Sequence, residues 1–506
     1  MLNKHLSRLI NLFTSSSFID RKAIIITLGY LFLATFIPTV KLSFVLGFLF
    51  FGLLVFCYSF PKAIAYSMIP LLYLSSGQTH SFIAVPAQAI HSLQYWEGRH
   101  LIFSLSPFFV ILASALLFLP FFLLKSKKVF KLFFHEKIIF ILFGMFVLSA
   151  IYNSQLLIFS LLSIVQEFLV VVWGFYLMIL SNILSQNNWK KMLFTIALIM
   201  TLVLSQDALI ALGQTVMRAP LGLVAERASV APVFGLGVDE NSGVFRPFGI
   251  HSHPNGLAND QILLAFSILI LVTYLGNKGF FGKKIKNDFF VFVLAVSILT
   301  IILSLSRAAF LAVFAALLVF KFRHASKFKV FRTMKQVVDK FGIVLKLIIL
   351  VAGSTLVFRL SDRLFNSIYS FSEFGGIATR TKQYLEAIEV FKTFPILGTG
   401  VGMFMTASYQ LFPDGVMRYF PEPVHNNFLL FATERGIVAI FLYLIFIIKS
   451  FQFIENSQFA KTTKTMIYSG VVSIFVMMLF HPQNNFFSFL VLIILSLMHY
   501  EKAKNN

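Results

Sequence analysis

The sequence predicts an all-α, polytopic integral membrane protein with about fourteen transmembrane helices. Of the 506 residues, 58% are hydrophobic and only 12% are charged, whereas a soluble domain carries about 25% charged residues. Phe alone occupies 64 positions. Long apolar runs recur from one end of the chain to the other. Helices suit such runs because a helix satisfies its own backbone hydrogen bonds inside lipid.

The apolar runs mark the expected membrane segments in chain order. We place them near 23–38, 42–60, 63–75, 101–124, 138–152, 156–182, 192–210, 256–275, 289–305, 308–320, 343–358, 425–448, 465–481 and 486–499. Several of these, including 63–75 and 308–320, are short for a hydrocarbon core of ~30 Å, so the expected count is roughly 12–14. The chain then divides into N-terminal transmembrane helices (1–210), a central part (211–450) and C-terminal transmembrane helices (451–506).

The distribution of charge predicts which loops face the cytoplasm. The net charge is +22, and inner membrane proteins collect Lys and Arg in cytoplasmic loops, so this charge does not indicate nucleic acid. Loops such as KSKKVFK and KFRHASKFKVFR then lie inside, with both termini. Two long segments, 211–255 and 359–424, lie outside, and the second precedes the helix that starts near 425. We expect a multi-pass protein of the bacterial inner membrane, in contact with membrane lipids.

The type of basic residue also differs between the two sides. The expected inside loops are rich in Lys, and the outside segments are rich in Arg. Arg grips phosphate with two parallel hydrogen bonds, so the outer face suggests a ligand that carries phosphate. The alternative is simple pairing with neighbouring acids, which Arg227 beside Glu226 and Arg363 beside Asp362 illustrate.

Metal and disulfide chemistry have little support in the sequence. The single cysteine, Cys57, excludes an intramolecular disulfide and a cysteine-based metal site. His251, His253, His425 and His481 could meet in space, but no H-E-x-x-H motif or carboxylate cluster accompanies them.

The outer segment 359–424 contains one predicted helix and one glycine-rich turn. TRTKQYLEAIEVFKTF places Tyr384, Leu385, Ile388 and Phe391 on one helical face, and Pro395 ends the helix. We expect this helix to lie along or cap the outer membrane surface. LGTGVGMF follows, but its spacing is not that of a nucleotide-binding loop, so we expect a tight turn beside a ligand.

Two polar islands interrupt the apolar chain at expected outer ends of helices. In the first, FRPFGIHSHPNG, Arg246 and His253 precede a helix for which Asn255 is the expected N-cap. A helix N-terminus that faces outward can itself bind an anion. Arg307, in LSLSRAAF, lies either in an outer hairpin between two helices or buried in the bundle. It has no acid within about ten residues, so it needs a distant partner or an anionic ligand.

The second island is PEPVHNNFLL, where His425 begins the expected outer end of a helix. A neutral imidazole there can accept a proton from an attacking hydroxyl group. The alternative is a histidine that caps the helix and is held by Asn426 or Asn427.

The order of these motifs resembles the O-antigen ligase and O-antigen polymerase superfamily of bacterial envelope glycan transferases. The order is R-P-F-G-x-H-x-H-P-N, then S-R-A-A, then an outer loop with R-x-x-x-Y and G-x-G, then H-N-x-x-L, and it covers about residues 240 to 450. The resemblance implies a membrane glycosyltransferase that needs neither metal nor cofactor. The implied donor is a glycan on undecaprenyl diphosphate at the periplasmic face, and the implied acceptor is lipid A core or another lipid-linked glycan.

The resemblance also implies roles for individual residues. Arg246, Arg307 and Arg380 match diphosphate-binding arginines, and His425 matches the general base. His253, Asn255 and Asn426 are expected to support them.

Two questions stay open at this point. A transporter or flippase for lipid-linked glycans would share the outer arginines, but it should carry more charge within its membrane segments and show internal repeats. The charged residues expected within or near the membrane are Glu167, Asp207, Asp260 and Arg307. Ligase and polymerase, and the sugar and linkage, are not distinguished.

Overall fold

The computed structural model describes most of the chain. The described residues are 18–36, 40–76, 82–84, 103–125, 134–154, 156–223, 238–239, 244–251, 253–323, 376–419, 423–480 and 486–505. The expected helix at 343–358 and His481 lie outside these residues. So do the pairs Arg227–Glu226 and Arg363–Asp362, most of the expected inside loop 321–342, and parts of the outer segments 211–255 and 359–424.

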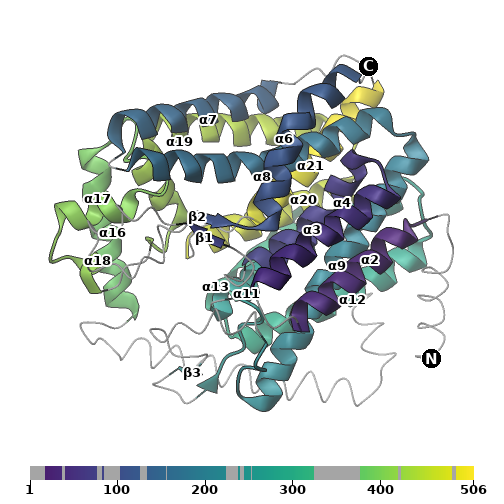
Figure 1. Cartoon of the computed structure of the whole chain (residues 1–506), viewed down its shortest axis with the longest axis horizontal. Coiled ribbons are helices and arrows are strands. Elements are labelled where there is room, and N and C mark those ends of the chain that lie inside the picture. Colours follow the sequence, from purple (N-terminus) through teal and green to yellow (C-terminus); the bar gives the residue numbers. More distant parts are fainter. Residues whose placement is uncertain are drawn as a thin grey trace.

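The described chain is helical almost throughout (Figure 1). The helices of the first part are α2 (Arg21–Phe36), α3 (Val40–Cys57), α4 (Phe60–Ser76), α6 (Pro107–Lys125), α7 (Phe134–Asn153), α8 (Leu157–Ile183) and α9 (Gln186–Met217). Those of the second part are α11 (Pro254–Asn277), α12 (Lys283–Ser304), α13 (Arg307–Arg323), α16 (Gly376–Thr393), α17 (Phe404–Leu411), α18 (Val416–Tyr419), α19 (Asn427–Asn456), α20 (Lys461–Met478) and α21 (Phe486–Asn505). Apart from 343–358, every expected membrane segment coincides with one of these helices.

Two short antiparallel strand pairs lie between helices. β1 (Phe82–Ala84) pairs with β2 (Phe103–Leu105), and β3 (Val238–Asp239) pairs with β4 (Val244–Phe245). The second pair leads directly into Arg246.

Five of the described helices are long and apolar enough to cross a membrane, judged by length and composition: α8, α9, α11, α12 and α19. Five other apolar helical stretches are shorter, including those in α3, α4 and α6. The all-α fold is therefore confirmed as a bundle of apolar helices, but the expected count of about fourteen spans is not established.

The bundle is apolar both inside and outside. Trp173 and Trp189 are fully buried, whereas Phe56 is 90% exposed and Leu117 is 80% exposed on the outer surface. A helix that is hydrophobic on all sides is stable only when its outer face meets lipid or other protein. The exposed apolar surface therefore fits a membrane environment.

The two ends of the bundle are held by different contacts, polar at one end and apolar at the other. One end, which we call the basic end, collects the starts of α9, α12 and α20 and the ends of α11, α13, α19 and α21. Side-chain contacts join these ends: Lys278 with Glu501 at 2.9 Å, Asn277 with Thr463 at 2.9 Å, and Arg323 with Glu455. At the opposite end, Ala258, Ile301, Ala308 and Met477 pack together and join the starts of α11 and α13 to the ends of α12 and α20.

A small helical unit covers part of this opposite end. We call it the cap; it comprises α16, α17, α18 and the glycine-rich loop 395–403, and its helices lie at the left edge of Figure 1, away from the C-terminus. The cap has a core of its own around Ala387, Phe404, Met417 and Val424. The predicted helix before Pro395 is therefore confirmed.

The buried face of α16 differs from the one that the sequence predicted. Gln383, Ala387 and Val390 are fully buried, whereas Leu385 is 60% exposed and Ile388 is 40% exposed. The sequence pattern identified a helical face made of large apolar side chains, among them Leu385 and Ile388. The structure instead buries the smaller ones, because α16 packs closely against α17 and α19.

We predict that the cap and the basic end lie on opposite sides of the membrane, with the cap outside. Thr393, on the cap, and Lys461, at the basic end, are both exposed, so each can be replaced by cysteine in a Cys57→Ser background. In sealed right-side-out vesicles, a membrane-impermeant maleimide should label the Thr393→Cys protein and spare the Lys461→Cys protein. Labelling of the Lys461→Cys protein alone would invert the orientation.

Candidate functional site

Arg246 lies against the turn between α12 and α13. Its side chain is buried; Nε donates to the carbonyl of Ser304 at 2.9 Å, and Nη2 donates to Oδ1 of Asn255 at 3.2 Å. These bonds fix the plane of the guanidinium group at the level where α11 begins and α12 ends. The structure thus brings together two of the predicted site residues, Arg246 and Asn255.

The start of α11 differs by two residues from the expected one. His253 is the N-cap, and its Nδ1 accepts from the backbone N–H of Asn255 at 3.1 Å, while Pro254 occupies the first helical position. The prediction that Asn255 caps this helix is therefore wrong. Because the imidazole of His253 takes the capping role, the amide of Asn255 is available to hold Arg246.

Arg307 lies in a hairpin between α12 and α13 and not within the bundle, as in the first of the two alternatives; the side of the membrane that this hairpin faces stays a prediction. α12 ends at Ser304, Leu305 adopts a left-handed conformation (φ 51°), and Arg307 opens α13. The side chain is half-buried. Arg307 makes no hydrogen bond or ion pair with another residue of the described part of the chain. Ser304, which accepts from Arg246, lies three positions before Arg307, so two arginines share this turn.

The loop from Arg246 to His253 is anchored by α9. The side-chain oxygen of Gln214 accepts from the backbone N–H groups of Phe248 (3.0 Å) and Gly249 (2.9 Å), and its amide nitrogen donates to the carbonyl of Gly249 (2.8 Å). Gly249 has φ +61° and lies directly over the carboxylate of Asp207, so a side chain would not fit there.

His251 is held between two buried carboxylates. Its Nε2 is 3.2 Å from Asp207 of α9, and its Nδ1 is 3.6 Å from Asp260 of α11. Burial by itself lowers the pKa of His251. The carboxylates of Asp207 and Asp260 outweigh this effect and raise the pKa from 6.5 to about 9. His251 is therefore charged at neutral pH. The sequence showed two isolated membrane acids and an unassigned histidine, and no local spacing indicated that they meet.

His425 lies beside α16 of the cap. Its Nδ1 is 3.3 Å from Oε1 of Gln383, and the hydroxyl of Tyr384 donates to its backbone carbonyl at 3.1 Å. Burial and the nearby Arg380 lower the pKa of His425 to about 4, against a weaker opposing hydrogen bond to the backbone of Pro423. The imidazole is therefore neutral at physiological pH.

Asn426, rather than His425, caps α19. Its Oδ1 accepts from the backbone N–H of Leu429 at 3.1 Å, and the helix begins at Asn427. The alternative in which His425 is itself the capping residue is therefore wrong. Gln383 was missed by the sequence reading, although it stands one residue before the Tyr of the R-x-x-x-Y pattern that begins at Arg380.

The turn that carries Arg246 and Arg307 lies at the same end of the bundle as His425. Phe428, three residues after His425, packs against Phe475 of α20, with ring centroids 6.0 Å apart. Two residues later on α20, Met477 packs against Ala308, the neighbour of Arg307. The C-terminal end of α20 therefore lies between the two groups of site residues and contacts both, through Phe475 on the side of His425 and through Met477 on the side of Arg307.

The helix α19 is broken at Gly436, where the backbone has a positive φ that essentially only glycine adopts (φ 72°, ψ 179°). Phe431 lies before the break and Tyr443 after it, yet their ring centroids are 5.3 Å apart. On a straight helix these residues would be about 18 Å apart. The chain therefore bends sharply at Gly436.

The loop 395–403 of the cap supplies the hydrogen bonds that the break removes. The N–H groups of Thr399 and Gly400 donate to the carbonyls of Thr433 (2.9 Å) and Glu434 (3.0 Å), and the N–H of Ile437 donates to the carbonyl of Pro395 (2.8 Å). Backbone groups at membrane depth need such partners. The break therefore joins the cap to α19.

Three glycines allow this loop to approach so closely. Gly398, Gly400 and Gly402 all have positive φ (73°, 98° and 76°). A side chain on Gly398 would overlap the backbone at Glu434, and one on Gly400 would lie 2.9 Å from Oγ of Ser160 on α8. The predicted tight turn is confirmed, and these close neighbours of its glycines are protein groups of α8 and α19.

The residues before the break form a buried charged cluster. Arg435 pairs with Glu167 of α8 and with Glu434 at 3.3 Å. Its guanidinium group lies between the rings of Phe146 (4.9 Å) and Phe431 (4.8 Å). The backbone N–H groups of Gly402 and Phe404 donate hydrogen bonds to the carboxylate of Glu434. Glu167, which the sequence places within or near the membrane, is therefore paired with Arg435.

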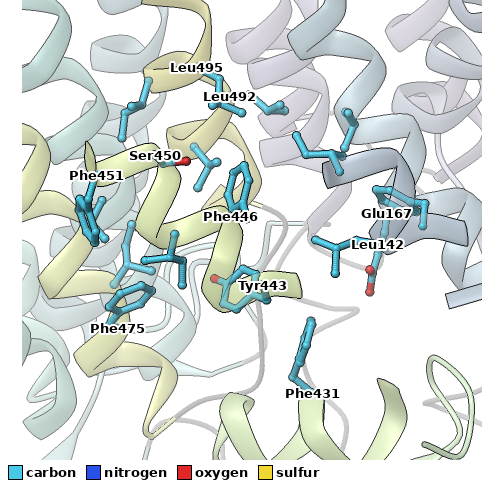
Figure 2. Close-up of a pocket in the computed structure, with 18 of the residues that line it drawn as sticks. Leu142, Glu167, Phe431, Tyr443, Phe446, Ser450, Phe451, Phe475, Leu492 and Leu495 are labelled. Carbon is cyan, nitrogen blue, oxygen red and sulfur yellow. The ribbon is translucent and has the colours of Figure 1, made fainter. Parts of the chain in front are cut away.

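An apolar cavity of about 260 Å³ lies below this cluster, between α7, α8, α19, α20 and α21 (Figure 2). Glu167 and Phe431 line it near the break, and Tyr443, Phe446 and Leu495 line it farther along the bundle. Phe475, which contacts Phe428 beside His425, lines it as well. The cavity therefore lies within the apolar bundle, where one of its lining residues, Phe475, contacts Phe428, three residues after His425.

We predict that Gly436→Ala separates the cap from the bundle. A Cβ at this position would overlap the backbone of Ile396, and a backbone conformation of this kind, open essentially only to glycine, costs another residue roughly 1–3 kcal/mol. Thermal unfolding of the purified protein should begin several degrees lower. Gly144→Ala is the matched control, since a Cβ on Gly144 of α7 has nothing within 4 Å. Equal stability of both variants would refute this account of the break.

Comparison with known proteins gives one family match. Residues 291–444 match the family model described as O-Antigen ligase. The matched segment contains Arg307, Arg380 and His425, whereas Arg246 lies before it. No curated protein matches the chain. The match agrees with the resemblance in the sequence: residues 291–444 of this chain are similar to the O-antigen ligase family.

Proposed function

We propose that this protein transfers a glycan from a lipid diphosphate, of the undecaprenyl type, to an acceptor hydroxyl at the outer face of the bacterial inner membrane. The observation that carries the proposal is the neutral His425, held by Gln383 and Tyr384 beside Arg380. It lies at the same end of the bundle as Arg246 and Arg307. A base and several arginines at one membrane surface suit a reaction whose leaving group is a diphosphate.

Arg246, Arg307 and the start of α11 are assigned to the diphosphate. Arg246 is held rigidly by Ser304 and Asn255, and Arg307 has no counter-ion in the described part of the chain. The N-terminus of α11 adds its own positive potential nearby. Fixed positive groups stabilise the negative charge that develops on the leaving group, and they do so strongly in a site that excludes water.

His425 is assigned as the general base. It accepts the proton of the acceptor hydroxyl as the oxygen forms a bond to the anomeric carbon, and the bond from that carbon to the diphosphate breaks. We assign the proton of the neutral ring to Nδ1, directed to Oε1 of Gln383, so that Nε2 carries the lone pair. Gln383 therefore sets the tautomer without adding negative charge.

The charge of Arg380 makes the pKa of His425 depend on whether the donor is bound. Its charge contributes to the low pKa of His425. A diphosphate bound beside Arg380 offsets that charge, so the pKa of His425 rises when the donor is in place. The base is then stronger in the loaded enzyme than in the free one.

The remaining parts suit a lipid-linked donor and a polar acceptor. The apolar cavity beside Phe475 and Phe446 fits a hydrocarbon chain, and the cap faces the aqueous side, from which an acceptor glycan arrives. With arginines neutralising the leaving group, we propose that the reaction requires no metal. Deletion of the gene distinguishes the acceptors: polymer left on its lipid carrier indicates a ligase, and single repeat units on the final acceptor indicate a polymerase.

We predict that His425→Ala abolishes transfer but retains donor binding, because the arginines are untouched. Loss of a general base should cost on the order of 10²–10⁴-fold in turnover. Transfer from purified undecaprenyl-diphosphate glycan should survive excess EDTA in the wild-type protein. Full activity of His425→Ala would remove the base assignment. Activity that EDTA abolishes and a divalent cation restores would place the protein in another catalytic class.

We predict that Arg307→Lys impairs transfer although the charge is kept, because an ammonium group cannot form the two parallel bonds of a guanidinium. Arg323→Lys is the matched control: Arg323 ends the same helix at the basic end, where it pairs with Glu455. The Michaelis constant for the donor should rise in Arg307→Lys and stay unchanged in Arg323→Lys. Wild-type kinetics in both variants would leave Arg307 as a structural charge.

A further inference from the structure

The cluster of Asp207, His251 and Asp260 has no part in the mechanism above, yet it is costly to bury. Both carboxylates are fully buried, and His251 is 5% exposed. Ionisable groups within a membrane protein are expensive unless they pair with one another or serve a function. Here one histidine bridges two acids that come from different helices, α9 and α11.

The cluster lies directly under the loop that carries Arg246. Gly249 touches the carboxylate of Asp207, and a Cβ on Gly256 would lie 3.3 Å from the side chain of His251. Gln214 fixes the same loop from α9 through three backbone hydrogen bonds. The loop is therefore fastened on its inner side by α9 and α11, while Arg246 points to the turn between α12 and α13.

We propose that Asp207, His251 and Asp260 are positioning residues for the transfer reaction, which hold the loop so that Arg246 meets the donor diphosphate beside Arg307. This inference rests on the proposed function of Arg246. His251 holds the loop in place because each of its ring nitrogens faces one carboxylate, Asp207 on α9 and Asp260 on α11, so the loop contacts both helices. None of the three residues contacts the substrate; they act through Arg246.

The pairing of His251 with the two carboxylates depends on the positive charge of its imidazole. The groups that face the imidazole are Asp207 on α9, Asp260 on α11 and the ring of Tyr73 on α4, at 6.4 Å between centroids. The pKa of His251 is about 9, above its ordinary value of 6.5. A raised folded-state pKa means that this stabilisation is complete below about pH 6.5 and is lost as the pH rises through 9. Without one of the two carboxylates, the pKa of His251 is raised less. The stabilisation by charged His251 is then lost at a lower pH.

The test is a double-mutant cycle between the cluster and Arg246. The dissociation constant of undecaprenyl diphosphate in lipid nanodiscs is measured for the wild-type protein, Asp207→Asn, Arg246→Ala and the double variant, with Asp260→Asn as a second cluster variant. Alone, Asp207→Asn should weaken binding about tenfold; in the Arg246→Ala background it should have no further effect. The alkaline limit of activity should move from about pH 9 to lower pH in Asp207→Asn and Asp260→Asn.

The matched control is Thr201→Val, which removes a buried hydroxyl of α9 that bonds only within its own helix in the contacts seen here. It should change neither binding nor the pH limit. Additive losses in the cycle, or an alkaline limit that does not move in either Asp→Asn variant, would overturn the positioning role. An Arg246→Ala protein that binds the diphosphate as the wild type does would instead overturn the proposed function of Arg246, and the inference with it.

Discussion

The architecture of the site depends on one exchange of backbone hydrogen bonds. At Gly436 the helix α19 leaves helical geometry, and the groups thereby freed are paired with residues 395–400 of the cap. Inside or next to lipid, an unpaired peptide group costs several kcal/mol. The break and the loop therefore require each other. Because His425 stands just before α19 and Gln383 lies on α16, the same exchange sets the position of His425 relative to Gln383.

Several charged residues of the bundle follow one rule: each pairs with an opposite charge. Glu167 pairs with Arg435, and Asp207 and Asp260 pair with His251. Buried ions need such partners because desolvation costs several kcal/mol per ion. Arg307 departs from the rule in the described part of the chain. A cation that protein groups do not neutralise is suited to an anionic substrate, and this contrast within one bundle supports the assignment of Arg307 to the diphosphate.

The N-terminal helices contribute to the site as well as to the membrane anchor. The family match covers residues 291–444, yet Asp207 and Gln214 of α9 hold the loop of Arg246. The cap and the loop thus approach the reaction from different parts of the chain. The proposed base, His425, comes from the second polar island and Arg246 from the first, and the end of α20 lies between His425 and the turn that carries Arg307. A catalytic pair assembled in this way can exclude water between rigid elements.

The sequence by itself determined the membrane class, the positions of most helices and the two polar islands. Apolar runs, prolines and the asymmetry of Lys and Arg are local signals, and lipid imposes them on every segment separately. His425, Arg246 and Arg307 were recognisable because polar groups at helix ends stand out against an apolar background. The ordered motifs also indicated the superfamily. Their roles in the reaction remain predictions.

Only the tertiary structure decided which groups meet. It gave the capping role to His253 instead of Asn255, selected the small residues of α16 for burial, and paired His251 with two acids from other helices. It also showed that Gln383 faces His425 and that Gly436 breaks a helix that reads as continuous in the sequence. Each of these outcomes depends on a partner far away in the chain. Local spacing carries no information about such partners, because they meet only when the packing of the whole bundle places them side by side.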